Sequence, residues 1–413
     1  MPTLDDLRQI IRRIESARPP RPAAEPVEHV LGGEIVDTGA GSLLVVRHDY
    51  PLTHTVGRHP LNAAFSLRTD ALAVIARPGE EPTDPTRLLF LDAETTGLAG
   101  GTGTYAFLVG AGRIEADRFV VRQFFMRDLD EEPALLAALT PLLTEAAGVV
   151  TFNGTGFDLP LLETRFVLGR RRWTPSFAHV DLLRPARRVW VTAMPDCRLA
   201  TLERSVLGVV REDDVPGALI PTLYFQYLRT RRAQPLARVL AHNRDDVLAL
   251  AGLLGWFARA LGGSASLTAH ELLGLGRLWE ARDPERSVAY YREALAAGLS
   301  GMAAVWTCLR LAAWEKRRER WEMACALWEN AATRGIFDPR PWAELAKFHE
   351  HRARDLPAAH RVVTTALDRA LAAAAPTRVI NDLTYRLGRL NRRLSATRQP
   401  ARGGRPAVAP SRR

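Results

Sequence analysis

The spacing of apolar and polar positions changes several times along the chain, and each change predicts a different element. Three runs rich in apolar and β-branched residues, separated by turns, predict a meander of strands. Helical and strand-like runs then alternate, which predicts an α/β fold with a mixed sheet flanked by helices. The strand-like runs are 87–94, 104–115, 118–128 and 148–154, and the helical runs are 131–146, 158–169 and 242–261.

A different pattern begins after Gly263, where strand-like runs cease and helical spacing continues almost to the end. Segments around Ala294, Ala331 and Ala366 align with spacings of 37 and 35 residues, near the period of about 34 in tetratricopeptide-type hairpins. A helical-repeat domain and an irregular helical bundle both fit. We expect four parts along the chain. Residues 1–85 form a segment of unassigned role with a helix, a Pro-rich linker and short strands, and residues 86–263 form an α/β domain. Residues 264–396 form an all-α domain, and residues 397–413 form a basic disordered tail.

Composition is that of a globular protein, with 47% hydrophobic and 25% charged residues among 413. The apolar run 247–258 is shorter than the roughly 20 residues that cross a bilayer. The first residues include two aspartates and are unlike a signal peptide. Three scattered cysteines match neither a disulfide framework nor a zinc site. We therefore expect a cytoplasmic protein that does not enter the membrane.

The net charge of +10 favours a polyanionic partner such as nucleic acid, because neutralised phosphates release counterions. Part of this charge lies at the end of the chain, where residues 398–413 include five arginines and no acid. That tail has the Pro and Gly content of a disordered segment. It fits a solubilising terminus and a nucleic-acid-binding arm equally well.

Two carboxylates stand at the end of an apolar strand-like run, in "LLFLDAETTG". Residues two apart in a strand share a face and lie about 7 Å apart, so Asp92 and Glu94 are predicted to point the same way. Their repulsion would raise a pKa unless a cation lay between them. Carboxylates are the ligands that Mg²⁺ and Mn²⁺ prefer. Two solvated acids at a strand end are the other interpretation of this pair.

Further acids follow later in the chain. Asp158 begins a helical run after "VVTFNGTGF", where it fits either a metal ligand or a helix N-cap. In "AHNRDDVLAL", Asp246 shares a helix face with apolar residues and is predicted to point inward, unlike Asp245. His242 lies one turn earlier on the same side. It is a candidate for proton transfer, and a capping or packed histidine is the alternative.

Together these stretches resemble a known family. "LDAETTG", "FNGTGFDLPLLETR" and "HNRDDV", in that order, resemble the three exonuclease motifs of the DEDD nucleases, a branch of the ribonuclease H-like fold. The stretches "FLDAETTGLAGGTGTYAFLVGAG", "HVDLLRPARRVW" and "PGALIPTLYFQYLR" are similar to the YprB-like subgroup. The resemblance covers about residues 87–261 and implies a ribonuclease H-like mixed sheet, followed here by the all-α helical-repeat domain.

The resemblance also implies a site and an activity. Asp92, Glu94, Asp158 and Asp246 would bind two divalent ions, Mg²⁺ or Mn²⁺, and His242 would orient or deprotonate the attacking water. His242 precedes Asp246 by four residues, which is the spacing of the family's tyrosine branch rather than the five of its histidine branch. The implied function is a 3′–5′ exonuclease that hydrolyses DNA or RNA by a two-metal mechanism.

A non-catalytic adaptor is the alternative interpretation. Such a protein would bind nucleic acid or another protein through the ribonuclease H-like fold and the helical repeats, because a fold by itself does not define an activity. The expected partner of the nuclease is a single-stranded end of DNA or RNA. A protein partner would bind the concave surface that a helical-repeat domain provides.

Overall fold

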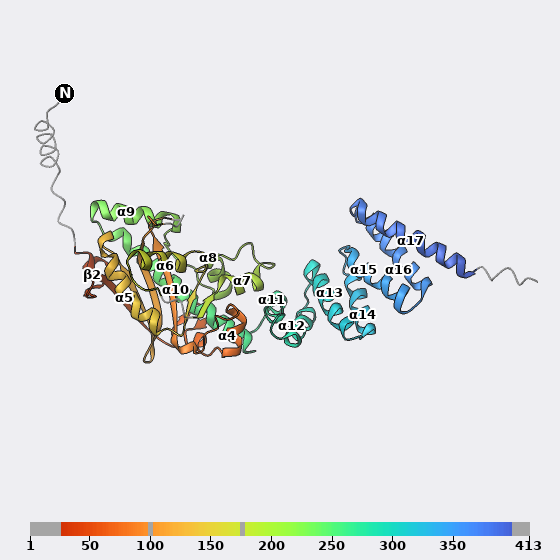
Figure 1. Cartoon of the computed structure of the whole chain (residues 1–413), viewed down its shortest axis with the longest axis horizontal. Helices are drawn as coiled ribbons and strands as arrows, with labels where there is room; N and C mark the ends of the chain where they lie inside the picture. The colour runs from red at the N-terminus through yellow and green to blue at the C-terminus, as the bar shows by residue number, and fades with distance from the viewer. Residues whose placement is uncertain (1–25, 98–101, 174–177, 399–413) are drawn as a thin grey trace, which may run out of the picture. The chain divides into compact units, whose positions relative to one another are not determined.

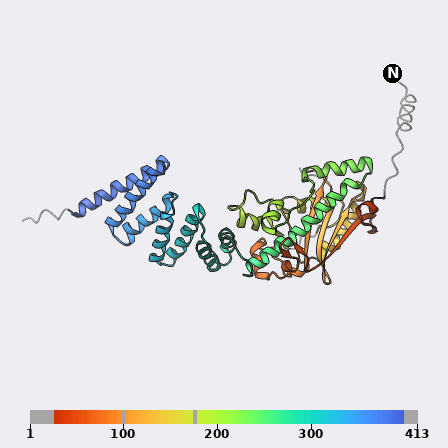
Figure 2. The same ribbon diagram turned by 180° about the vertical axis from the view of Figure 1, so that it is seen from behind.

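The computed structural model describes residues 26–97, 102–173 and 178–398. The chain divides into two compact units, Met1–Leu267 and Thr268–Arg413. The first unit combines a sheet with helices and the second is helical (Figures 1 and 2), which confirms the predicted fold class. The expected N-terminal helix and nearly all of the basic tail lie outside the described residues.

A seven-stranded sheet runs through the described part of the first unit, in the order β1-β2-β7-β6-β5-β8-β9. The expected meander of β5, β6 and β7 is confirmed, since neighbouring strands in it are antiparallel. β8 and β9 add to the other side of β5 in parallel, so the sheet is mixed. The strands are β1 (Glu34–Asp37), β2 (Ser42–Pro51), β5 (Leu88–Thr95), β6 (Ala106–Glu115), β7 (Arg118–Phe125), β8 (Gly148–Thr151) and β9 (Ala178–Asp181).

The strands β1 and β2 belong to this same sheet, although the sequence left the role of the N-terminal segment unassigned. β2 pairs with β7 over its length, from Leu44 opposite Phe125 to Pro51 opposite Arg118. A separate two-stranded ribbon follows, and short helices then lead to β5. These elements are β3 (Thr55–Val56), β4 (His59–Pro60), α3 (Asn62–Phe65), α4 (Thr69–Ile75) and the 3₁₀ turn η1 (Pro85–Arg87), whereas helix α2 (Val27–Leu31) precedes β1.

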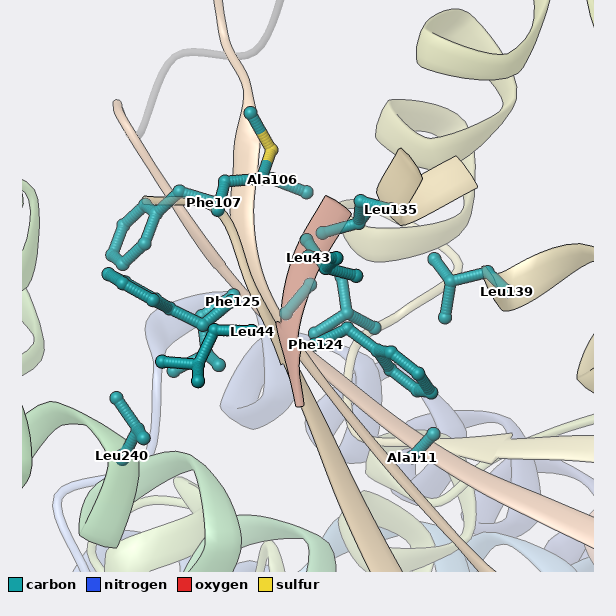
Figure 3. Close-up of a cluster of buried hydrophobic side chains, with 14 of the residues drawn as sticks. Leu43, Leu44, Ala106, Phe107, Ala111, Phe124, Phe125, Leu135, Leu139 and Leu240 are labelled. Carbon is teal, nitrogen blue, oxygen red and sulfur yellow. The ribbon is translucent and has the colours of Figure 1, made fainter. Parts of the chain in front are cut away.

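Helices cover both faces of the sheet. In Figure 3, Leu44, Phe125 and Leu240 gather on one face, and Phe124, Leu135 and Leu139 gather on the other. The alternation of side chains along each strand produces this division. The remaining helical elements of the unit are η2 (Leu129–Glu131), α5 (Glu132–Glu145), α6 (Asp158–Leu168), α7 (Leu183–Trp190), α8 (Leu199–Leu202), the π-helical turn η3 (Glu203–Leu207), η4 (Gly217–Leu219), α9 (Ile220–Thr230) and α10 (Gln234–Leu261).

Helix α10 lies directly against β5, β6 and β7, and two glycines of β6 make this close contact possible. A Cβ atom on Gly110 would stand 2.4 Å from Asn243 Oδ1 and 2.9 Å from Val247 Cγ2. On Gly112 it would stand 2.6 Å from Val247 Cγ1. Real Cβ contacts are longer, so any larger residue would push the helix away from the sheet. The "GAG" of β6 therefore sets the distance between the N-terminal half of α10 and β5.

The second unit consists of helices that pack against their neighbours along the chain, α11 with α12, α13 with α14, and α15 with α16. Ala294, Ala331 and Ala366 lie on α12, α14 and α16, and each is at most 1% exposed. None of the described helices of the chain is long and apolar enough to cross a membrane. The helices are α11 (Ala269–Trp279), α12 (Pro284–Ala296), α13 (Gly301–Arg317), α14 (Trp321–Thr333), α15 (Pro339–Lys347), the π-helical turn η5 (Phe348–Arg352), α16 (Leu356–Ala372) and α17 (Thr377–Arg398).

Candidate functional site

Asp92 and Glu94 lie on the part of β5 that extends past β8. The parallel pairing ends at Phe90 opposite Val150, whereas the antiparallel pairing with β6 continues through both acids. Beside the two acids, the edge of β5 that faces β8 is therefore not paired with that strand, and we call it the open edge of β5. Both side chains are partly exposed and alternate with buried neighbours, as expected for two residues on one face of a strand.

Asp158 is the first residue of α6 and is only 6% exposed. Backbone groups of Asp158 itself and of Ala93 in β5 partly oppose the rise in the pKa of its carboxyl, which lies close to the open edge of that strand. The loop before it is held by Asp181 at the end of β9, which accepts the amides of Asn153 at 2.7 Å and Thr155 at 3.1 Å. Asp181 thus shapes the loop that carries Asp158.

Helix α10 brings Asp246 and His242 to the same place. His242 Nε2 lies 3.6 Å from Asp246 Oδ2 and 3.9 Å from Glu94 Oε1, and both carboxylates are about 15% exposed, at 16% and 14%. Asp245 instead pairs with its neighbour Arg244 at 2.8 Å. The prediction that Asp246 rather than Asp245 points inward is confirmed.

The electrostatics of the four acids reflect burial and mutual repulsion. Burial, followed by the charges of Asp246, Glu94 and Asp158, raises the pKa of Asp92 well above its usual range. Burial is also the largest cause at Glu94 and at Asp158, where it raises the pKa to about 7 in each case. The pKa of Asp246 is raised by burial too, although its partner Arg211 opposes the shift. Four carboxylates, of which Asp158 is buried and the other three are only partly exposed, therefore share one region that carries too little positive charge.

This donor set fits hard divalent cations, because carboxylate oxygens are their preferred ligands and a cation would relieve the repulsion. The side chains do not form a finished coordination shell. Across residues 26–97, 102–173 and 178–398, no group of three His, Cys, Asp or Glu is arranged to hold a metal ion. Two of the acids engage protein donors instead. Asn243 Nδ2 donates to Asp92 Oδ2 at 2.9 Å, and Arg211 Nη2 donates to Asp246 Oδ1 at 2.5 Å.

Several polar residues around the acids were not predicted from the sequence. Asn243 donates to Asp92 and accepts from Gln123 Nε2 at 2.9 Å, a buried link between α10, β5 and β7. Asp214 Oδ1 lies 2.7 Å from His242 Nδ1, which orients the Nε2 atom of the ring towards Glu94 and Asp246. Only its place beside His242 in the motif could have indicated Asn243, and Asp214 carries no distinctive spacing.

Arg211 was also missed, and it pairs directly with one of the acids. Its side chain is 10% exposed, and its Nη2 atom forms ion pairs with Glu203 Oε1 at 2.6 Å and with Asp246 Oδ1 at 2.5 Å. Burial alone would lower the pKa of Arg211, but the two carboxylates outweigh it and the pKa is raised. Burial raises the pKa of Glu203 to about 7. Arg211 comes from the loop after η3, where "VVREDDVPG" is unremarkable as a sequence.

His242 is surrounded by acids. Burial pulls its pKa down, but Asp246, a hydrogen bond with Asp214, and Glu94 together raise it above its ordinary value. With no cation beside the carboxylates, the imidazole is thus held in its protonated form to a higher pH than usual. A divalent cation at the acids would reduce this effect, because it would screen the negative charge that favours imidazolium.

Comparisons with known proteins agree with this fold. The family model of the RNase_H superfamily matches residues 89–258, a range that includes all four acids and His242. The chain is also 31% identical over 366 residues to the uncharacterized protein YprB of Bacillus subtilis (strain 168), an alignment that covers 86% of each chain. The chain belongs to the YprB family of RNase H-superfamily proteins.

Proposed function

We propose that this protein is a metal-dependent nuclease that removes nucleotides from the 3′ end of single-stranded DNA or RNA. The observation that carries the proposal is the convergence of Asp92, Glu94, Asp158 and Asp246 from β5, α6 and α10, all with raised pKa values. Structural carboxylates would be paired or solvated. Repulsive acids on rigid elements are typical of sites that act on a charged substrate through bound cations.

In this proposal the four acids hold two divalent ions, Mg²⁺ or Mn²⁺. The ions would supply Lewis-acid stabilisation of the charge that develops on the phosphodiester oxygens. His242 Nε2 would take the proton of the attacking water, and Asp214 would keep the ring turned towards the acids through its contact with Nδ1. Asn243 fixes the rotamer of Asp92 by donating to both its side chain and its backbone carbonyl.

The four-residue spacing between His242 and Asp246 is compatible with this role. One turn of α10 separates the two residues, and the structure brings His242 Nε2 to 3.6 Å from Asp246 and 3.9 Å from Glu94. Proton transfer requires a base within hydrogen-bond reach of the water that it activates. A water held beside these acids would lie next to Nε2, so the spacing of the tyrosine branch does not exclude a histidine base.

A non-catalytic adaptor is the second candidate, and the position of Arg211 favours it. The guanidinium already neutralises Asp246 at 2.5 Å, as a resident cation would in a site that no longer binds metal. For a nuclease, Arg211 would have to share Asp246 with the ions or leave it. The two functions therefore differ in whether divalent cations bind at all.

We further propose that the second unit is a tetratricopeptide-like repeat that docks substrate or a partner protein. Support comes from its helix pairs and from the equivalent, buried placement of Ala294, Ala331 and Ala366 on alternate helices. A small residue at such a position allows neighbouring helices to pack closely. In a regular stack of repeats, the same close packing recurs in each repeat.

The test is incubation of the purified protein with end-labelled single-stranded DNA and RNA, with Mg²⁺, with Mn²⁺ and with chelator. We expect stepwise shortening of a 5′-labelled strand only when metal is present. Asp92→Ala should abolish shortening, whereas Asp245→Ala, the matched control one position from Asp246 in the motif, should retain it. Activity of Asp92→Ala within a few-fold of the parent would refute the site. No cleavage and no metal-induced change in melting temperature would favour the adaptor.

A further inference from the structure

The positive charge of the chain is concentrated in its second unit. Residues 268–413 contain 26 Lys and Arg against 15 Asp and Glu, whereas residues 1–267 contain 30 against 31. The unit that carries the four acids is therefore close to neutral overall. Proteins that bind nucleic acid gain much of their affinity by neutralising phosphates. If the substrate is a nucleic acid, the second unit is the better source of that affinity.

A pocket of about 490 Å³ lies between α13, α14, α15, η5 and α17 of this unit. Five of its lining side chains are Lys or Arg and one is Glu. The single glutamate, Glu344, pairs with two of them, since Lys316 Nζ and Lys347 Nζ both lie 2.7 Å from its carboxylate. One negative charge thus offsets two positive charges, and both lysines are about half exposed, at 43% and 51%.

Other cations of the pocket leave additional positive charge. Arg389 is balanced by Glu350, which lies behind it at 2.6 Å and also holds Arg393 at 2.6 Å. Arg386 donates a hydrogen bond to the backbone carbonyl oxygen of Ala343 at 3.3 Å. This acceptor is neutral, so the contact does not compensate the charge of Arg386. The pocket therefore has a net positive charge and is complementary to an anionic ligand.

Aromatic side chains stand among these cations. The rings of Trp321 and Phe348 stack with centroids 5.9 Å apart and planes 25° apart, and the guanidinium of the exposed Arg352 lies 5.3 Å over the Trp321 ring. Alternating cationic and aromatic groups are the combination that binds single-stranded nucleic acid, because phosphates pair with the cations and bases stack on the rings. An acidic peptide would use the cations but would leave the aromatic platform without a matching group.

We propose that this pocket binds a segment of the single-stranded nucleic acid on which the first unit acts. The inference rests on the proposed function for the identity of the ligand. Its evidence is independent, since it comes from the charge, the aromatic stacking and the volume of a pocket in the second unit. Other nucleotides of the bound nucleic acid would contact the remaining basic surface of that unit.

The test is binding without cleavage. Full-length Asp92→Ala protein in chelator is titrated against a fluorescent oligothymidylate, and anisotropy is followed at several salt concentrations. Lys347→Glu combined with Arg352→Glu should weaken binding by about tenfold or more and reduce the slope of log affinity against log salt by about one or two. Arg361→Glu combined with Arg378→Glu is the control, because both residues are exposed on α16 and α17 outside the pocket and the change in net charge is equal.

The control pair should bind within about twofold of the parent if the pocket is the site. Equal losses for both pairs would mean that general electrostatics, not this pocket, binds the strand. Unchanged binding for the pocket pair would also overturn the inference, as would competition by polyglutamate as strong as that by unlabelled oligonucleotide, which would indicate an acidic-peptide site. If binding depends on the pocket but the parent protein never cleaves nucleic acid, the inference about the pocket stands and the proposed nuclease function is refuted.

Discussion

Replacing Glu94 by glutamine should stabilise the metal-free protein at pH 8 but not at pH 5. The pKa of Glu94 is raised from 4.5 to about 7 in the folded protein, chiefly by burial and against the attraction of His242. The folded state holds this proton more tightly than the unfolded chain does. Protonation therefore contributes stability below pH 4.5, and this contribution is lost as the pH rises through about 7.

The size of the effect follows from the shift in pKa. One unit of pKa corresponds to about 1.4 kcal/mol, so the rise from 4.5 to about 7 means that ionised Glu94 costs the fold at most about 3.5 kcal/mol above pH 7. Asp246 and Asp158 share part of the repulsion, which lowers the expected gain of Glu94→Gln to about 1–3 kcal/mol. At roughly 2 to 4 °C per kcal/mol, the melting temperature of the first unit should rise by several degrees.

The assay is thermal unfolding of parent and variant in chelator at pH 5 and pH 8, followed by circular dichroism. Glu163→Gln, which replaces an exposed glutamate of α6, is the control and should not change the dependence on pH. Added Mg²⁺ should raise the melting temperature of the parent more than that of Glu94→Gln, because the variant lacks a ligand. Two results would refute the electrostatic account. One is a difference in melting temperature between variant and parent that is the same at both pH values, and the other is a variant that is less stable than the parent at pH 8.

Three further predictions concern neighbours of the acids. His242→Ala should lower turnover by about 100-fold or more if His242 is the base, and His242→Tyr should restore part of the rate; near-parental turnover from pH 6 to 9 would make His242 a packing residue. Asp214→Asn should lower kcat by about tenfold with an unchanged metal-induced shift in melting temperature, and a loss of metal binding would contradict a purely orienting role. Gly110→Ala should cost about 1–3 kcal/mol in urea unfolding because its Cβ would collide with α10, whereas Gly217→Ala, with no atom within 4 Å, should be neutral.

Much of the fold was predictable because its signals are local. The meander depends on alternating side chains and turns within β5 to β7, and the helical second unit depends on a change of period after Gly263. The strands β1 and β2 were not placed. β1 pairs with β2, and β2 in turn pairs with β7, which lies about 70 to 80 residues later in the chain. Period-2 alternation predicts a strand without specifying its neighbour.

The candidate ligands were predictable for the same reason. Asp92 and Glu94 follow a buried strand, Asp158 begins a helix, and Asp246 shares the apolar face of α10, so that each position follows from its own segment. That they meet is decided by the tertiary structure. The open edge of β5 beyond β8 and the glycine at 110 bring three elements together at distances that no single segment determines.

The polar surroundings of the acids belong entirely to the tertiary structure. Arg211 and Asp214 come from an irregular loop after η3, and they reach Asp246 and His242 only because that loop packs against α10. A hydrogen bond between residues about 30 positions apart leaves no period in the sequence, since its geometry depends on both backbones. The sequence by itself thus determined which residues are candidates for the chemistry, and the fold decided their distances, their burial and the partners that shift their pKa values.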